Sequence, residues 1–340
     1  MIFGCAGPAL SADERALFRG CRPLGFILFA RNCVDPDQLR RLVAEMRAAV
    51  DSADAPLLID QEGGRVARLG PPHWRKPPPA MVFGRLAARD RAAAREATTL
   101  NGRLIGRELI GLGITVDCTP VLDVPAPDGH DIIGDRAFGT DPALVADLGR
   151  ASCDGLLAEG VIPVIKHVPG HGRARADSHK ELPAVDVPVA DLRKVDFPPF
   201  RNLADAPWAM TAHVLYRAID PIRCASVSPR VIGDVIRGEI GFDGLLLSDD
   251  LNMQALSGTL AQRARAVLAA GCDVALHCSG VFAEMAAIAD ATPPMTAASM
   301  ARVARAEALR RDRQRAAPAM TAAEMSARLD ALLAGHRVGA

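Results

Sequence analysis

Residues 161–179 read VIPVIKHVPGHGRARADSH, and this stretch decides how the rest of the chain is interpreted. An apolar run from Val161 to Ile165 ends at Lys166 and His167, and the proline and two glycines that follow break any helical period. The run therefore predicts a strand, and the residues after it predict a loop that leaves the end of that strand. Three histidines, an aspartate and a lysine within this loop make it a candidate active site.

The same pattern, an apolar run that ends in a polar residue, recurs along the chain. The other runs span residues 25–29, 56–59, 114–116, 208–211, 244–247 and 273–276. Stretches with helical periodicity separate them, at residues 36–50, 85–112, 142–159, 189–202, 228–239 and 260–270. Strands that alternate with helices predict a parallel sheet, in which seven strands are readable.

Seven or eight such units in a chain of this length predict an α/β fold, a single-domain (β/α)8 TIM-type barrel over residues 1–340. The eighth strand is either residues 1–4 or an unrecognised segment of the C-terminal third, and residues from about 292 to 340 form a helical segment. A doubly wound sheet is the alternative, but no GxGxxG follows the first strand. Polar residues at the predicted strand ends fall where a barrel places its active site: Asp60, His167, His213, Asp249 and His277.

Composition excludes several classes of partner. The chain has 40 basic and 40 acidic residues, so it lacks the charge excess that nucleic acid or an anionic membrane surface attracts. The arginines of residues 302–315 alternate with alanine and leucine, which predicts a solvated helix face. Eight cysteines without a CxxC pair, no signal peptide and no apolar run of about 18 residues predict a cytoplasmic protein.

Two carboxylate motifs carry candidate chemistry. Asp249 ends an apolar strand, where a carboxylate is costly unless it faces a polar mouth, so we interpret it as a reactive residue. Asp250 fits an N-cap of the next helix or a supporting role. Asp177 and His179 lie two residues apart, and a carboxylate beside an imidazole fixes its tautomer and favours its protonated form, as general acid–base catalysis needs.

Further candidates precede this loop. Asp60 begins a segment in which two glycines, Gly63 and Gly64, would allow close approach of the backbone to a ligand. Asp60 would accept hydrogen bonds from sugar hydroxyls and Arg68 would donate them. We expect Arg136, within residues 132–139, to reach the same pocket. Arg65 is interpreted as a structural ion-pair partner.

A metal site is the rival interpretation of the loop. His167, His171, Asp177 and His179 are ligand types that zinc accepts. The proline and glycines suit a movable loop better than a fixed coordination shell, and no HExxH or other recognised spacing is present. We therefore expect no metal and no cofactor.

Taken together, these motifs resemble family 3 glycoside hydrolases, and more closely the bacterial cytoplasmic β-N-acetylglucosaminidases of peptidoglycan recycling. The resemblance lies in residues 166–172, 177–179 and 182–183, with supporting segments at 25–32, 60–68, 133–139 and 248–253. It covers most of the chain. Val168 stands where phenylalanine is common, and residues 173–176 replace small or acidic residues with Arg-Ala-Arg-Ala.

The resemblance implies roles for individual residues. Asp249 would be the catalytic nucleophile, His179 the acid/base and Asp177 its orienting partner. The positions that match those binding terminal N-acetylglucosamine are Asp60, Arg68, Arg136, Lys166 and His167. The implied activity is retaining exo-hydrolysis of muropeptides of the GlcNAc-β-1,4-anhydro-MurNAc type, by a monomer or weak homodimer. His171 is assigned only a structural role in the bend of the loop.

Three alternatives stay open. One is a family 3 enzyme with another exo specificity, such as a β-glucosidase. The others are a metal-dependent barrel hydrolase and a non-catalytic sugar-binding barrel. Larger family members have an additional C-terminal α/β domain, for which this chain is expected to be too short.

Overall fold

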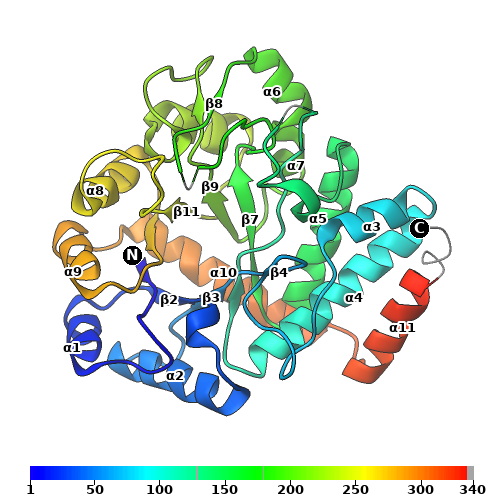
Figure 1. Cartoon of the computed structure of the whole chain (residues 1–340), viewed down its shortest axis with the longest axis horizontal. Coiled ribbons are helices and arrows are strands. Elements are labelled where there is room, and N and C mark those ends of the chain that lie inside the picture. Colours follow the sequence, from blue (N-terminus) through cyan, green and yellow to red (C-terminus); the bar gives the residue numbers. More distant parts are fainter. Residues whose placement is uncertain (128, 179, 335–340) are drawn as a thin grey trace.

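Eight parallel strands close into a barrel at the centre of the computed structural model, which describes residues 1–127, 129–178 and 180–334 (Figure 1). The barrel strands are β1 (Ile2–Phe3), β2 (Gly25–Leu28), β3 (Leu57–Ile59), β6 (Val116–Asp117), β7 (Ile162–Val168), β9 (Trp208–Thr211), β11 (Leu245–Asp250) and β12 (Val274–His277). Each pairs with the next along the chain, and β1 closes the ring by pairing Ile2 with Leu276 of β12. The predicted (β/α)8 barrel is confirmed, and its eighth strand is the N-terminal one.

Helices surround this ring. They are α1 (Ala12–Cys21), α2 (Pro36–Ala49), α3 (Ala80–Ala87), α4 (Arg91–Ile110), α5 (Pro142–Ala158), α6 (Val189–Val195), α7 (Phe197–Asn202), the π-helix η4 (Val231–Glu239), α8 (Leu260–Ala270), α9 (Phe282–Ala291), α10 (Ala297–Ala316) and α11 (Ala322–Ala334). Short 3-10 turns are η1 (Ala30–Asn32), η2 (Gly134–Arg136) and η3 (Ala225–Val227). No helix of the described residues is long and apolar enough to cross a membrane.

Two stretches expected to be single helices are pairs of helices. Between α3 and α4, the Asp90 side chain accepts a hydrogen bond from the backbone N–H of Ala93, so a new helix begins there. Between α6 and α7, prolines occupy the first turn of the second helix, where a missing N–H costs nothing.

Side chains alternate along the barrel strands and divide the core in two. Ile27, Leu58 and Trp208 belong to an inner cluster within the ring, whereas Phe26 and Ile59 pack outward against the helices. Both faces of each strand are therefore buried, which is why the strands read as continuous apolar runs.

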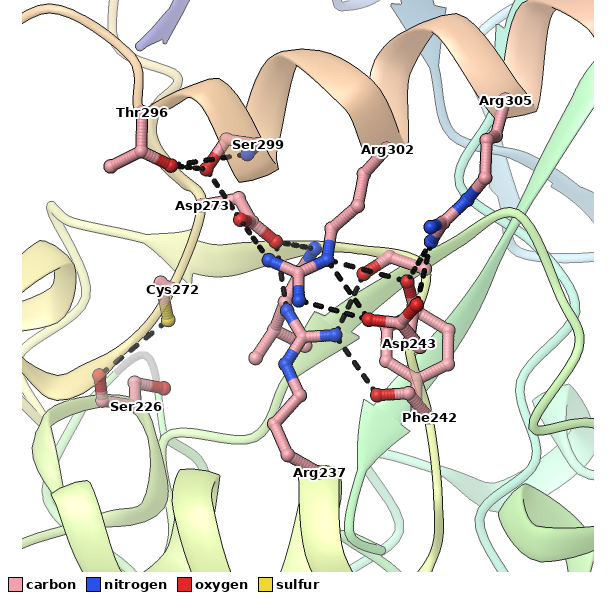
Figure 2. A network of polar contacts seen from close by, with 12 residues as sticks. Ser226, Arg237, Phe242, Asp243, Cys272, Asp273, Thr296, Ser299, Arg302 and Arg305 are labelled. Carbon is pink, nitrogen blue, oxygen red and sulfur yellow. Dashed lines mark hydrogen bonds and ion pairs between the residues drawn. The ribbon is translucent and has the colours of Figure 1, made fainter.

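Helix α10 lies across the N-terminal end of the barrel, where Ala306 joins the inner cluster (Figure 1). Figure 2 shows the polar network that holds it there. The Asp273 carboxylate, next to β12, accepts hydrogen bonds from Ser299 Oγ at 2.6 Å, Arg302 Nη1 at 2.9 Å and Arg237 Nη2 at 2.8 Å. Arg302 is therefore not part of a solvated helix face as predicted, because its guanidinium is paired with a buried carboxylate.

The remaining strands form two small sheets outside the barrel. β4 (Gln61–Gly63) and β5 (Val66–Ala67) make an antiparallel hairpin directly after β3. β8 (Ala184–Val185) pairs in parallel with β10 (Leu215–Tyr216). Both pairs lie in segments that follow the C-terminal ends of barrel strands, so they shape the end of the barrel where the polar residues gather.

Candidate active site

A cavity of about 280 Å³ opens at the C-terminal ends of the barrel strands. The residues that line it include six of the predicted site residues: Asp60, Arg68, Arg136, Lys166, His167 and Asp249. They come from four segments of the chain that the barrel brings to the same end. The volume lies just below the range of about 300–1,000 Å³ typical of pockets for drug-sized ligands, so it suits a ligand the size of one sugar ring.

Lys166 is the centre of a buried ion network in one wall of this cavity. Its Nζ lies 2.8 Å from Asp60 Oδ1 and 2.7 Å from Glu62 Oε1. Asp60 is also paired with Arg68 Nη2 at 3.0 Å, and Glu62 with Arg136 through two contacts of 2.8 Å. Each carboxylate thus faces two cations, which offsets the cost of burying the charges.

The pKa values in this network keep its charges fixed. Burial would raise the pKa of the Asp60 carboxyl, but Lys166 and Arg68 hold it well below its ordinary value. Burial would lower the pKa of the Lys166 ammonium, but Asp60 and Glu62 hold it above its ordinary value. Asp60 is consequently a permanent acceptor and Lys166 a permanent donor, an arrangement that suits the recognition of hydroxyl groups.

Asp249 lies at the end of β11, where it also lines the cavity. Its Oδ1 accepts a hydrogen bond of 2.8 Å from the backbone N–H of Asp250. Burial would raise the pKa of the Asp249 carboxyl, but His213 and His167 hold it below its ordinary value. An ionised carboxylate therefore lines the same cavity as the Lys166 network.

His213 supports the strand end that carries Asp249. Its Nδ1 lies 2.7 Å from Ser226 Oγ, and its Nε2 lies 3.1 Å from the backbone carbonyl oxygen of Asp250. Burial lowers the pKa of the fully buried His213 imidazole. A neutral ring can donate from Nε2 to this carbonyl oxygen, which holds the end of the strand in place.

Asp250 does not cap the following helix as one of our two interpretations predicts. Helix α8 begins at Leu260, and its N-cap is Thr259. Asp250 Oδ1 instead accepts backbone hydrogen bonds from Asn252 at 3.2 Å and Cys278 at 3.1 Å. Its carboxyl thus fixes the loop after β11 to the end of β12. Asp250 does not cap α8 because β11 ends too far before that helix in the sequence.

The glycines of the hairpin face protein and not a ligand, which contradicts our prediction. Gly63 and Gly64 have φ angles of 101° and 57° and form the turn between β4 and β5. A Cβ on Gly63 would lie 2.4 Å from the carbonyl oxygen of Pro78, and the Gly64 N–H donates to Pro77 O at 2.9 Å. The proline-rich loop thus packs directly on the hairpin. The two glycines allow the backbone of this loop, and not a ligand, to come close.

Arg65, interpreted as a structural residue, pairs with Asp135 at 3.1 Å and donates to the carbonyl oxygens of Asp131 and Ile132. These bonds hold the loop before η2, which carries Arg136. The positive φ of Gly134, 45°, permits the turn into η2.

The loop after β7 is held by Asp123, which our sequence interpretation missed. The Asp123 carboxylate accepts from His167 Nδ1 at 2.7 Å and from the backbone N–H groups of His167 at 3.2 Å and His171 at 2.6 Å. The sequence did contain a pattern that could have identified it. Asp123 interrupts the apolar run Val121, Leu122 and Val124, just as Asp60 and Asp249 each end an apolar run. Glu62 was also overlooked, although it lies within the quoted segment 60–68.

Beyond the bend, His171 is buried and its Nε2 lies 3.2 Å from Ser178 Oγ. Burial and the neighbouring His167 lower the pKa of the His171 imidazole to about 4, so the ring is neutral near pH 7. Ser178 lines the cavity. Asp177 is half-buried, and its backbone carbonyl accepts from the N–H groups of Lys180 and Glu181. His179, the predicted acid/base, lies outside the described residues.

The metal alternative receives no support from the part of the chain that the structure describes. There, no three His, Cys, Asp or Glu side chains are grouped so that they could hold a metal ion. Because the alternative set includes His179, the expectation of no metal stays a prediction.

Comparison with known proteins agrees with the geometry. Residues 12–309 match the glycosyl hydrolase family 3 N terminal domain. A β-hexosaminidase of Alkalilimnicola ehrlichii is 42% identical over 285 residues, which are 82% of this chain and 80% of that protein. The structure of NagZ from Neisseria gonorrhoeae matches with a TM-score of 0.84 at 30% identity, covering 98% of this chain and 97% of that one.

A second solved structure, a family 3 β-N-acetylglucosaminidase from Paenibacillus sp. str. FPU-7, matches with a TM-score of 0.85 at 31% identity. The match covers 97% of this chain and 66% of that longer protein. Sequence and structure therefore agree over nearly the whole chain, and the chain belongs to glycosyl hydrolase family 3.

Proposed function

We propose that the chain is a retaining exo-β-N-acetylglucosaminidase that removes terminal N-acetylglucosamine from peptidoglycan-derived muropeptides. The observation that carries the proposal is the ionised Asp249 at the end of β11, which lines the same cavity of about 280 Å³ as the Lys166 network. The names of the family 3 relatives, β-hexosaminidase and β-N-acetylglucosaminidase, support the choice of sugar.

The Lys166 network is the proposed site for the terminal sugar. Asp60 supplies an ionised acceptor and Lys166 a charged donor at a separation of 2.8 Å, so adjacent hydroxyls of one ring can bind both. Arg68, Arg136 and His167 add further polar groups on the same wall. A cavity with room for one ring favours cleavage at a chain end.

In the proposed mechanism, Asp249 attacks the anomeric carbon and forms a covalent glycosyl-enzyme as the bond to the leaving oxygen breaks. His179 as imidazolium protonates that oxygen, and the neutral imidazole then takes a proton from the water that hydrolyses the intermediate. Asp177 orients His179. The assignments of His179 and Asp177 rest on the motif at residues 177–179.

A histidine in this role differs from the usual pair of carboxylates in retaining glycosidases. A neutral imidazole does not repel the negatively charged nucleophile, whereas a second carboxylate would. The unperturbed pKa of histidine, about 6.5, also lies near the expected working pH.

The cytoplasm is the proposed location, because all eight cysteines are free thiols in the structure. We further propose a GlcNAc-β-1,4-anhydro-MurNAc type of substrate and a monomer or weak homodimer without cofactor. EDTA should then leave kcat/KM unchanged. Inhibition by EDTA that zinc reverses would favour the metal-dependent alternative.

Covalent trapping tests the central assignment. A 5-fluoro-N-acetylglucosaminyl fluoride keeps the acetamido group, while its fluorine slows breakdown of the glycosyl-enzyme by destabilising the positively charged transition state. We expect one sugar per chain, with the label on the peptide that contains Asp249. The variant Asp249→Ala should remain unlabelled, and Asp234→Asn, at an exposed position of η4, should label like wild type.

Label on any other carboxylate would contradict the nucleophile assignment. Paired assays on nitrophenyl glycosides separate the specificities, since the proposal requires kcat/KM for the N-acetylglucosaminide to exceed that for the glucoside. The reverse order would favour a β-glucosidase of the same family.

A further inference from the structure

Asp123 is a fully buried carboxylate whose hydrogen bonds, within the described part of the chain, all go to the end of β7 and the loop after it. Asp123 lies in the segment after β6. The described residues that line the cavity include His167 but not Asp123. The three donors to Asp123 that described residues supply belong to His167 and His171. A buried carboxylate with this set of partners fixes the shape of the loop where the loop enters the site.

The two oxygens of Asp123 have different partners. Oδ1 accepts the two backbone N–H groups, at 3.2 Å from His167 and 2.6 Å from His171. Oδ2 lies 2.7 Å from His167 Nδ1. Burial would raise the pKa of the Asp123 carboxyl, but His167 and His171 hold it below its ordinary value. An ionised carboxylate can only accept, so the hydrogen in the Oδ2 contact belongs to the imidazole.

This arrangement selects one tautomer of His167. With the hydrogen on Nδ1, the second ring nitrogen, Nε2, carries a lone pair in the neutral ring. His167 lines the cavity, so this lone pair is available to a ligand hydroxyl that donates a hydrogen bond. Lys166 next to it can only donate, and the two residues together offer one donor and one acceptor.

We propose that Asp123 is a positioning residue, which holds His167 in the Nδ1–H tautomer so that Nε2 accepts a hydrogen bond from a hydroxyl of the terminal sugar. The inference rests on the proposed function for its ligand. Carboxylates behind metal-binding and catalytic histidines act in this way, and their loss typically costs about 10- to 100-fold in affinity or activity.

The variant Asp123→Asn separates tautomer control from loop anchoring. The asparagine Oδ1 can still accept both backbone N–H groups, so the anchors of the loop are kept. Its Nδ2 replaces Oδ2 and donates, so His167 Nδ1 must accept and the hydrogen moves to Nε2. The acceptor in the cavity becomes a donor, while the shape of the side chain is unchanged.

Nitrogen-15 NMR of enzyme with labelled histidines shows which ring nitrogen of His167 carries the hydrogen. The His167 signals are assigned as those that are absent from the spectrum of His167→Gln. We expect Nδ1–H in the wild type and Nε2–H in Asp123→Asn. We also expect kcat/KM on nitrophenyl N-acetylglucosaminide to fall about 10- to 100-fold in Asp123→Asn. In the His167→Gln background, Asp123→Asn should cause no further loss, because the two residues act as one unit.

Nε2–H in the wild type would overturn the inference without any variant, even if Asp123→Asn failed to fold. The inference would also be overturned if Asp123→Asn lowered kcat/KM in the His167→Gln background as much as it does in the wild type. Asp123 would then act on the loop alone and not through His167. The tautomer is measured without substrate. A wild type that shows Nδ1–H but does not hydrolyse N-acetylglucosaminides would therefore refute the proposed function, and with it the sugar hydroxyl as the ligand.

Discussion

Glu62 and Arg136 form a two-pronged ion pair in the cavity wall, with Nε–Oε2 and Nη2–Oε1 both at 2.8 Å. The pair joins two segments that are 74 residues apart, the β4–β5 hairpin and the η2 turn. Because Glu62 also contacts Lys166 at 2.7 Å, one carboxylate sets the positions of two cations that we assign to the sugar.

Replacing Glu62 with glutamine should weaken both binding and stability. The variant keeps the shape but leaves Arg136 and Lys166 without one negative charge, and the loss of one partner in a buried pair costs about 3–5 kcal/mol. We expect a higher KM and a lower free energy of unfolding, measured by initial rates and urea titration. Glu239→Gln, in the surface pair with Arg193, is the matched control and should cost less than about 1 kcal/mol. Equal effects of the two variants would argue against a special role for Glu62.

Replacing His179 with alanine should affect substrates according to their leaving groups. A nitrophenolate departs without a proton, whereas a sugar oxygen needs one, and a general acid contributes about 10²- to 10⁴-fold. We expect a large loss of kcat/KM on a disaccharide substrate and a much smaller loss in the pre-steady-state burst on nitrophenyl N-acetylglucosaminide. Equal losses on both substrates would contradict the acid role.

The charge of Asp249 should make stability depend on acid pH. Its pKa in the folded chain lies below the ordinary value of 3.8, so its ionised form contributes stability that is complete above about pH 4. This contribution is lost as the pH falls through the lower, folded-state pKa. The difference in unfolding free energy between wild type and Asp249→Asn should therefore be constant from pH 5 to 7 and shrink toward pH 3. A difference that stays flat to pH 3 would mean that Asp249 is not held ionised by its neighbours.

Replacing Asp273 with asparagine should destabilise the fold and leave the active site intact. Asp273 pairs with Arg302 and Arg237 (Figure 2), and the pairs lie at the N-terminal end of the barrel, away from the cavity at the C-terminal ends of the strands. We expect a loss of about 3–5 kcal/mol in urea unfolding, with kcat/KM unchanged at 25 °C. The exposed pair of Arg315 and Asp312 provides the control, since Arg315→Met should change neither quantity. A fall in kcat/KM for Asp273→Asn would show that the two ends of the barrel are coupled.

The barrel was predictable because its strands have both faces buried and most of them end at a polar residue. That pattern is local, and it identified seven strands, with residues 1–4 as one of two options for the eighth. Ile2 and Phe3 are too short a run to be identified alone, and only the contacts with β2 and β12 make them a strand. The β4–β5 hairpin was missed for a similar reason, since its two glycines also fit a ligand-binding loop.

The candidate site was predictable as a set of residues but not as a network. Asp60, Lys166 and Asp249 end apolar runs, so their positions at one end of the barrel follow from the fold. The roles of Glu62 and Asp123 depend on which cations and imidazoles face them, and those partners lie 44 or more residues away in the sequence. Local patterns do not specify such pairings. The catalytic roles themselves stay predictions.

The pairing of β1 with β12 has a consequence for the order in which the molecule assembles. Ile2 and Phe3 pair with residues 276 and 277, so the ring cannot close during synthesis until residue 277 has left the ribosome. Such long-range contacts are slow to form compared with helices. We therefore expect nascent chains that end before β12 to expose the apolar edges of β1 and β11. A cell that makes this enzyme would have to shield those edges, and expression should respond to chaperone supply more than to changes at the cavity.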